Sequence, residues 1–94
     1  MREFRVRRSV NVPYNRQGAI WFTMKRYHSM PDQKKKRVNE LLRAAAGENW
    51  EALLDYFTSD DGNKAVLKKH HIASLTTISR AMKKFMEAFP DDLL

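Results

Sequence analysis

Residues 64–89 read KAVLKKHHIASLTTISRAMKKFMEAF, and this order predicts two helices joined by a turn. The first helix is expected over residues 64–71 and the second over residues 75–89. Ser74 lies directly before the second helix, where its hydroxyl can accept a hydrogen bond from backbone N–H groups that have no partner inside the helix. The apolar residues of the second helix recur at the three-and-four spacing of one buried face, and they are Leu75, Ile78, Met82, Phe85, Met86 and Phe89.

The opposite face of this second helix is expected to carry hydroxyls and positive charges. An advance of about 100° per residue places Arg80 almost opposite the buried face. Four residues flank it, namely Thr76, Thr77, Lys83 and Lys84. The pattern is compatible with a helix that reads DNA and with a solvated outer helix of a bundle.

A resemblance to known proteins rests on residues 77–82, Thr-Ile-Ser-Arg-Ala-Met, with Ser74 three positions upstream. The stretch resembles the recognition helix of bacterial repressors of the Lac repressor type. It is also similar to the C-terminal DNA-binding region of sigma-like regulators from phages and mobile elements. The resemblance covers residues 64–89, about a quarter of the chain. It implies a helix-turn-helix with Leu67 and Ile78 buried; the base-facing positions would be Thr76, Thr77 and Arg80.

The stretch departs from this family pattern at two positions. Lys68 stands where a small residue usually lets the two helices approach, and Ile72 stands where glycine usually makes the turn. A turn that is looser, or shifted by one residue, is therefore expected.

The remainder of the chain predicts one small all-α domain. Helices are expected over residues 16–29, capped by Asn15, and over residues 32–46 and 48–58. Together with the last two helices they form a bundle of four to five helices over residues 15–94. Residues 1–14 alternate in polarity and predict an extended basic arm that ends near Pro13. Pairing of this arm with a strand at residues 19–24, or with a second copy of the chain, remains an alternative.

Composition excludes several classes of protein. The 94 residues contain no Cys, so disulfides, thiolate catalysis and the usual zinc sites are excluded. No apolar run approaches the roughly 20 residues of a membrane helix, and no signal peptide is apparent. We therefore expect a cytoplasmic protein without membrane contact. No glycine-rich phosphate loop or acid/base constellation is present, which predicts that the protein is not an enzyme and has no catalytic residues, metal site or cofactor.

The charge distribution points to a polyanionic partner. The net charge is +7, whereas residues 38–63 hold only Arg43 against six acidic residues. Eight basic residues are expected to face DNA phosphates: Lys34, Lys35, Lys36, Arg37, Lys64, Lys69, Lys83 and Lys84. Four arginines of the arm suit a narrow minor groove, and these are Arg2, Arg5, Arg7 and Arg8.

These features favour sequence-specific binding of double-stranded DNA by a small transcriptional regulator of the phage or mobile-element type. RNA polymerase, another regulator or a second copy of the chain are the further partners this interpretation allows. One rival hypothesis is a protein-interaction module, such as an inhibitor or polymerase adaptor, that uses the acidic helix 48–58. Another is non-specific nucleic-acid binding through the arm.

Overall fold

A computed structural model of the protein describes residues 12–94, and every regular element in this range is helical. The expected all-α class is confirmed. The five α-helices are α1 Tyr14–Lys25, α2 Asp32–Ala46, α3 Trp50–Thr58, α4 Asn63–Lys69 and α5 Leu75–Ala88. Three short 3-10 helices accompany them, and these are η1 Tyr27–Ser29, η2 Gly47–Asn49 and η3 Asp91–Leu93.

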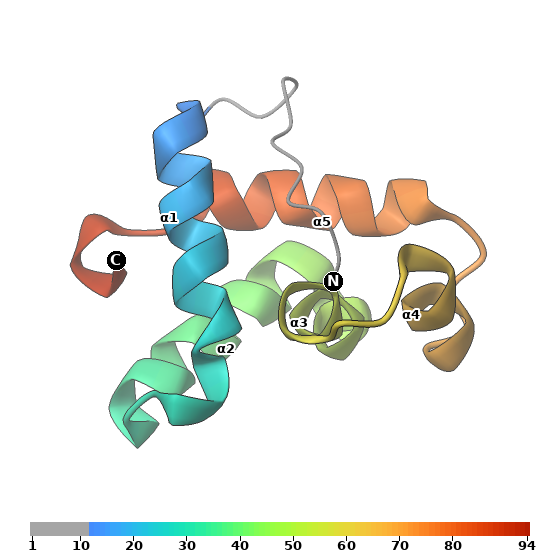
Figure 1. Ribbon diagram of the computed structural model, residues 1–94, viewed down its shortest axis with the longest axis horizontal. Helices are drawn as coiled ribbons and strands as arrows, with labels where there is room; N and C mark the ends of the chain where they lie inside the picture. Colours follow the sequence, from blue (N-terminus) through green and yellow to red (C-terminus); the bar gives the residue numbers. More distant parts are fainter. Residues whose placement is uncertain (1–11) are drawn as a thin grey trace.

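The helices form a small bundle in which α2 and α3 hold the others together. α2 packs against both α5 and α3, and α3 also contacts α1, α4 and α5. Figure 1 shows α5 running across the molecule, with α1 upright near its C-terminal end and α4 near its N-terminal end. α4, the turn and the start of α5 therefore lie at one end of the bundle, and the rest of α5 extends across it toward α1.

A chain of aromatic rings joins three helices in the core. Trp21 of α1 lies edge-on to Phe57 of α3, with ring centroids 4.7 Å apart. Phe57 lies 5.3 Å from Phe85 of α5, which in turn lies 5.4 Å from Phe89. Such pairs add stability beyond the burial of their area. The most deeply buried aliphatic side chains around them are Ile20, Met24, Val38, Leu42, Leu53, Ile78, Met82 and Met86.

The first helix differs from the expected one at both ends. α1 begins at Tyr14, and Asn15 lies inside its first turn, where its Oδ1 accepts a hydrogen bond from the Arg16 N–H at 2.9 Å. It ends at Lys25, and η1 follows instead of a continued α-helix. The alternative strand at residues 19–24 is wrong. Ile20 and Met24 are fully buried four residues apart, which is the spacing of a helical face.

The arm expected over residues 1–14 lies mostly outside the described residues, including all four of its arginines, Arg2, Arg5, Arg7 and Arg8. The described part begins at Val12, which is buried and whose carbonyl accepts a hydrogen bond from Gln17 Nε2 at 2.9 Å. The chain is thus already packed against α1 two residues before that helix starts.

The C-terminal residues do not form the solvated tail that Pro90 and the two following acids suggest. Leu93 is buried, and Asp91 forms an ion pair with Arg16 of α1. Asp92 accepts two hydrogen bonds from the Arg37 guanidinium, at 2.6 and 3.3 Å. The tail is therefore folded back across α1 and α2.

Candidate nucleic-acid interface

α5 is divided lengthwise into a buried and an exposed side. Ile78 and Phe85 have no exposed surface, and Met82, Met86 and Phe89 are also buried. The exposed side carries Thr76, Thr77, Arg80, Lys83 and Lys84. The two faces expected from the sequence are confirmed, except that Leu75 is only half-buried and Phe89 lies directly after the end of α5.

The start of α5 is fixed by a side-chain cap. Ser74 has an extended backbone, and its Oγ accepts a hydrogen bond from the Thr76 N–H at 3.1 Å. This bond satisfies one of the N–H groups that the helix leaves without a partner. The cap holds the Thr76 and Thr77 backbone in helical geometry at the exposed end of α5.

The turn before α5 is a Schellman motif built on a histidine. His71 has φ +57°, the left-handed conformation that glycine usually supplies at this position. The Ile72 N–H donates to the Leu67 carbonyl at 2.9 Å, and the His71 N–H donates to the Lys68 carbonyl at 3.2 Å. Leu67 and Ile72 both pack against the core, as this motif favours. The turn is thus shifted by one residue from the family pattern.

We expect His71→Gly to increase the free energy of unfolding by about 1 kcal/mol, because a residue with a Cβ pays a steric penalty in the left-handed region. The matched control is His70→Gly, at a position with an ordinary φ of −101°. This control should destabilise the protein, since it removes a side-chain hydrogen bond. Urea denaturation of both variants measures the difference, and a loss of stability in His71→Gly would contradict the assigned turn.

A cluster around Asp55 attaches α4 to α3. Asp55 Oδ2 lies 2.6 Å from His70 Nε2 and 3.1 Å from Lys69 Nζ. Burial raises the pKa of Asp55, but the hydrogen bonds from His70 and Lys69 outweigh it, so this pKa lies below its ordinary value. The cluster uses the positive charge of Lys69, which the sequence assigned to a DNA phosphate.

This pKa shift makes a prediction about stability and pH. A carboxyl whose pKa is lowered by folding stabilises the fold above the unfolded pKa of about 4, and the stabilisation is lost as the pH falls through the folded pKa. Asp55→Asn should therefore cost about 1 kcal/mol at neutral pH and flatten the loss of stability in acid. Glu51→Gln, an exposed acid on the same helix, is the control. Identical pH profiles for the two variants would contradict this role of Asp55.

The remaining cations of the α4–turn–α5 unit face solvent. Within residues 12–94, the ion pairs include none of Arg80, Lys83 and Lys84. Lys64 and Lys68 are likewise exposed on α4. Lys68 stands where the helix-turn-helix proteins that this stretch resembles usually have a small residue. Because its side chain is exposed, it does not interfere with the packing of α4 against the core. Lys68 thus adds a positive charge to the exposed surface beside the turn.

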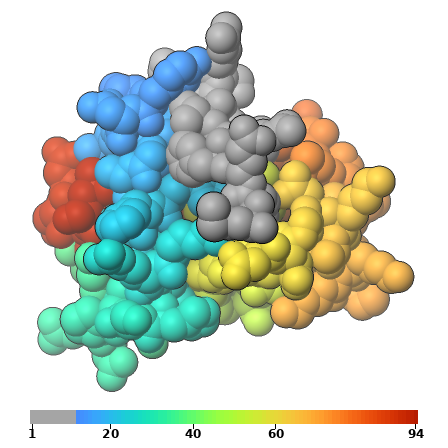
Figure 2. Space-filling view, in the orientation of Figure 1, coloured from blue at the N-terminus to red at the C-terminus, as the bar shows by residue number. Residues whose placement is uncertain are grey.

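The second basic group, residues 34–37, is not part of this surface. It lies in the first turns of α2, which project at the lower left in Figures 1 and 2, whereas α5 starts at the opposite side of the molecule. Arg37 is paired with Asp92, Lys35 Nζ lies 5.7 Å from the centre of the Tyr27 ring, and Lys34 lines a surface pocket. Only Lys36 of the four is exposed without such a contact among the described residues.

One exposed aromatic residue was missed by the sequence analysis. Phe22 of α1 is 61% exposed, and the Arg26 guanidinium lies over its ring at 4.2 Å. A signal was present, because Phe22 falls outside the helical face formed by Ile20, Trp21 and Met24.

Two further observations bear on function. Among residues 12–94, no three His, Asp or Glu side chains converge as metal ligands would, and no helix is long and apolar enough to cross a membrane. Comparison of the chain with protein-family models, curated proteins and solved structures finds no match.

Proposed function

We propose that the protein binds double-stranded DNA through the α4–turn–α5 unit, with α5 in the major groove. The observation that carries this proposal is the exposed side of α5, which combines two threonines with Arg80, Lys83 and Lys84 and opposes a fully buried side. A helix anchored on one side and rich in hydroxyls and cations on the other, with the exposed acid Glu87 only in its last turn, suits insertion into a groove about 12 Å wide.

The exposed residues divide by chemistry into two roles. Arg80 can donate two hydrogen bonds to the O6 and N7 atoms of guanine, while Thr76 and Thr77 can meet base edges or a thymine methyl group. Lys83 and Lys84 are placed further along the helix and suit phosphate contacts, as does Lys64 at the start of α4. The capped N-terminus of α5 adds a partial positive charge toward the DNA.

We further propose that this binding is sequence-specific and serves a small transcriptional regulator of the phage or mobile-element type, as the resemblance of residues 64–89 implies. The rival hypothesis, a partner that docks on residues 48–58, has less support. Asp55 of that segment is engaged by Lys69 and His70, which leaves Glu48 and Glu51 as its exposed acids.

Selection of bound fragments from a random duplex library tests the proposal, and we expect a consensus sequence to emerge.

The salt dependence of affinity tests the phosphate contacts. Replacing Lys83 and Lys84 together by alanine should reduce the slope of log affinity against log salt by about 2 units. Lys36→Ala, at an exposed position on α2, should change the slope less than Lys83→Ala or Lys84→Ala alone. Binding without a consensus, with a slope that depends equally on all three lysines, would contradict the proposed interface.

A further inference from the structure

Phe22 stands between two hollows on the surface of α1. The larger has a volume of about 440 Å³, and its walls include Phe22, Thr23, Arg26, Met30, Lys34 and Leu94. The smaller, of about 280 Å³, is lined by Gly18, Trp21, Phe22 and Lys25. We call the larger hollow the Phe22 pocket.

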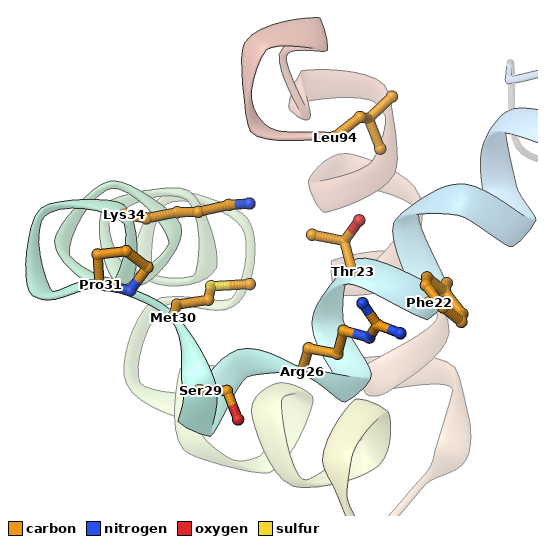
Figure 3. Close-up of a pocket in the computed structure, with 8 residues that line it drawn as sticks. All are labelled: Phe22, Thr23, Arg26, Ser29, Met30, Pro31, Lys34 and Leu94. Atoms are coloured by element: carbon orange, nitrogen blue, oxygen red, sulfur yellow. The ribbon is translucent and has the colours of Figure 1, made fainter.

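The Phe22 pocket combines apolar walls with two positive charges. Figure 3 shows Lys34 extending from α2 into the space, with Thr23 and Arg26 on the opposite wall and Met30 below. No aspartate or glutamate is among the residues that line either hollow. Leu94, which is 44% exposed, adds a further apolar side chain at the rim. An occupant that is both apolar and anionic would complement this surface.

The neighbouring surface already holds a segment of that chemistry. The chain's own C-terminal residues place Asp91 against Arg16 and Asp92 against Arg37, and the residue that follows them, Leu93, is buried. A third hollow, of about 300 Å³, connects the two regions, since its lining includes both Lys34 of the Phe22 pocket and Leu93. The surface formed by α1 and α2 thus binds two acids and an adjacent leucine within the molecule, and Arg26 and Lys34 extend it.

We propose that the Phe22 pocket docks an acidic segment of a partner protein that carries a large apolar side chain. The apolar side chain packs on Phe22 and Met30, and flanking carboxylates pair with Arg26 and Lys34. The pocket is built by the end of α1 and the start of α2, away from the N-terminal end of α5 (Figure 1). A partner bound there leaves the exposed side of α5 free, so the protein can connect DNA to a second protein.

The test uses a fluorescently labelled synthetic peptide in which acidic residues flank one phenylalanine, and fluorescence anisotropy measures its affinity. The double variant Arg26→Glu with Lys34→Glu should weaken binding about tenfold or more, because two charge pairs become repulsive. The control is Lys36→Glu with Lys64→Glu, which makes the same change in net charge at exposed positions outside the pocket. It should retain most of the affinity, and circular dichroism should show both variants folded.

The apolar contact is tested separately. A peptide with glycine in place of its phenylalanine should bind about tenfold more weakly than the parent peptide, and Phe22→Ser should weaken the parent peptide to a similar extent. In NMR spectra, the parent peptide should shift the methyl resonances of Thr23 and Met30.

Four outcomes would overturn the proposal. Equal loss of peptide affinity in the two double variants would reduce the effect to net charge. Equal affinity of the peptides with and without phenylalanine would remove the apolar contact. A concentration-dependent dimer in sedimentation that Phe22→Ser abolishes would make a second copy of this chain the occupant. Finally, a loss of DNA affinity in the Arg26/Lys34 double variant as large as that of the α5 lysine variants would assign the pocket to DNA.

Discussion

Ile78→Lys is expected to unfold the protein. Ile78 has no exposed surface and lies on the buried side of α5, within the core cluster that also contains Met82 and Phe85. A lysine there would place a charge in apolar surroundings at a cost of several kcal/mol, which is comparable with the whole stability of a domain of this size. Loss of the thermal transition in circular dichroism measures the effect.

Thr77→Lys is the matched control for this variant. It introduces the same side chain one position earlier in α5, where the native residue is exposed. Its free energy of unfolding should remain within about 0.5 kcal/mol of that of the unaltered protein. An Ile78→Lys protein with an intact cooperative transition would show that the buried face of α5 has been assigned wrongly.

Arg80→Ala is expected to leave the fold intact and to remove sequence discrimination. Arg80 is exposed, and no ion pair within residues 12–94 includes it. A lost contact to a base edge should reduce the preference for the selected sequence over random DNA by about 1–3 kcal/mol, or roughly 5- to 150-fold.

Lys84→Ala provides the comparison for Arg80→Ala. A lysine that contacts a phosphate should weaken binding to selected and random DNA by the same factor. If Arg80→Ala also weakens both equally, Arg80 contacts a phosphate, and the base-facing residues must be sought elsewhere on α5.

Much of the helical architecture could be predicted from local sequence. α2 has the predicted bounds, because Pro31 and Gly47 mark its two ends. The start of α5 and its buried face also follow from one capping serine and one apolar stripe. The predicted bounds of α1 were wrong, because its polar and apolar residues are not separated onto opposite faces of the helix. Asn15 therefore looked like a cap although the helix begins before it.

Contacts between distant segments were beyond local reasoning. Arg37 and Asp92 are 55 positions apart, and only the folded chain brings them together. The same is true of Asp55 with Lys69 and His70, although the sequence predicted that Lys69 faces a DNA phosphate. Periodicity identifies which side of a helix is exposed, but it contains no information about which charges lie next to one another across the bundle.

The turn between α4 and α5 shows how a departure from a pattern can be informative. Because Ile72 stands where glycine usually makes the turn, the sequence predicted a turn that is looser or shifted by one residue. In the structure His71 adopts the left-handed conformation, and Ile72 is instead used for packing. The identity of the left-handed residue could not be predicted, since neither His70 nor His71 is glycine or asparagine.

The most direct test of the central claim, that the exposed side of α5 contacts DNA, is NMR chemical-shift mapping with a duplex obtained by selection. We expect the largest backbone amide shifts at Thr76, Thr77 and Arg80, followed by Lys83 and Lys84, with little change around Phe22 and at the start of α2. Largest shifts at Phe22 or residues 34–37, with the α5 amides unperturbed, would contradict the claim.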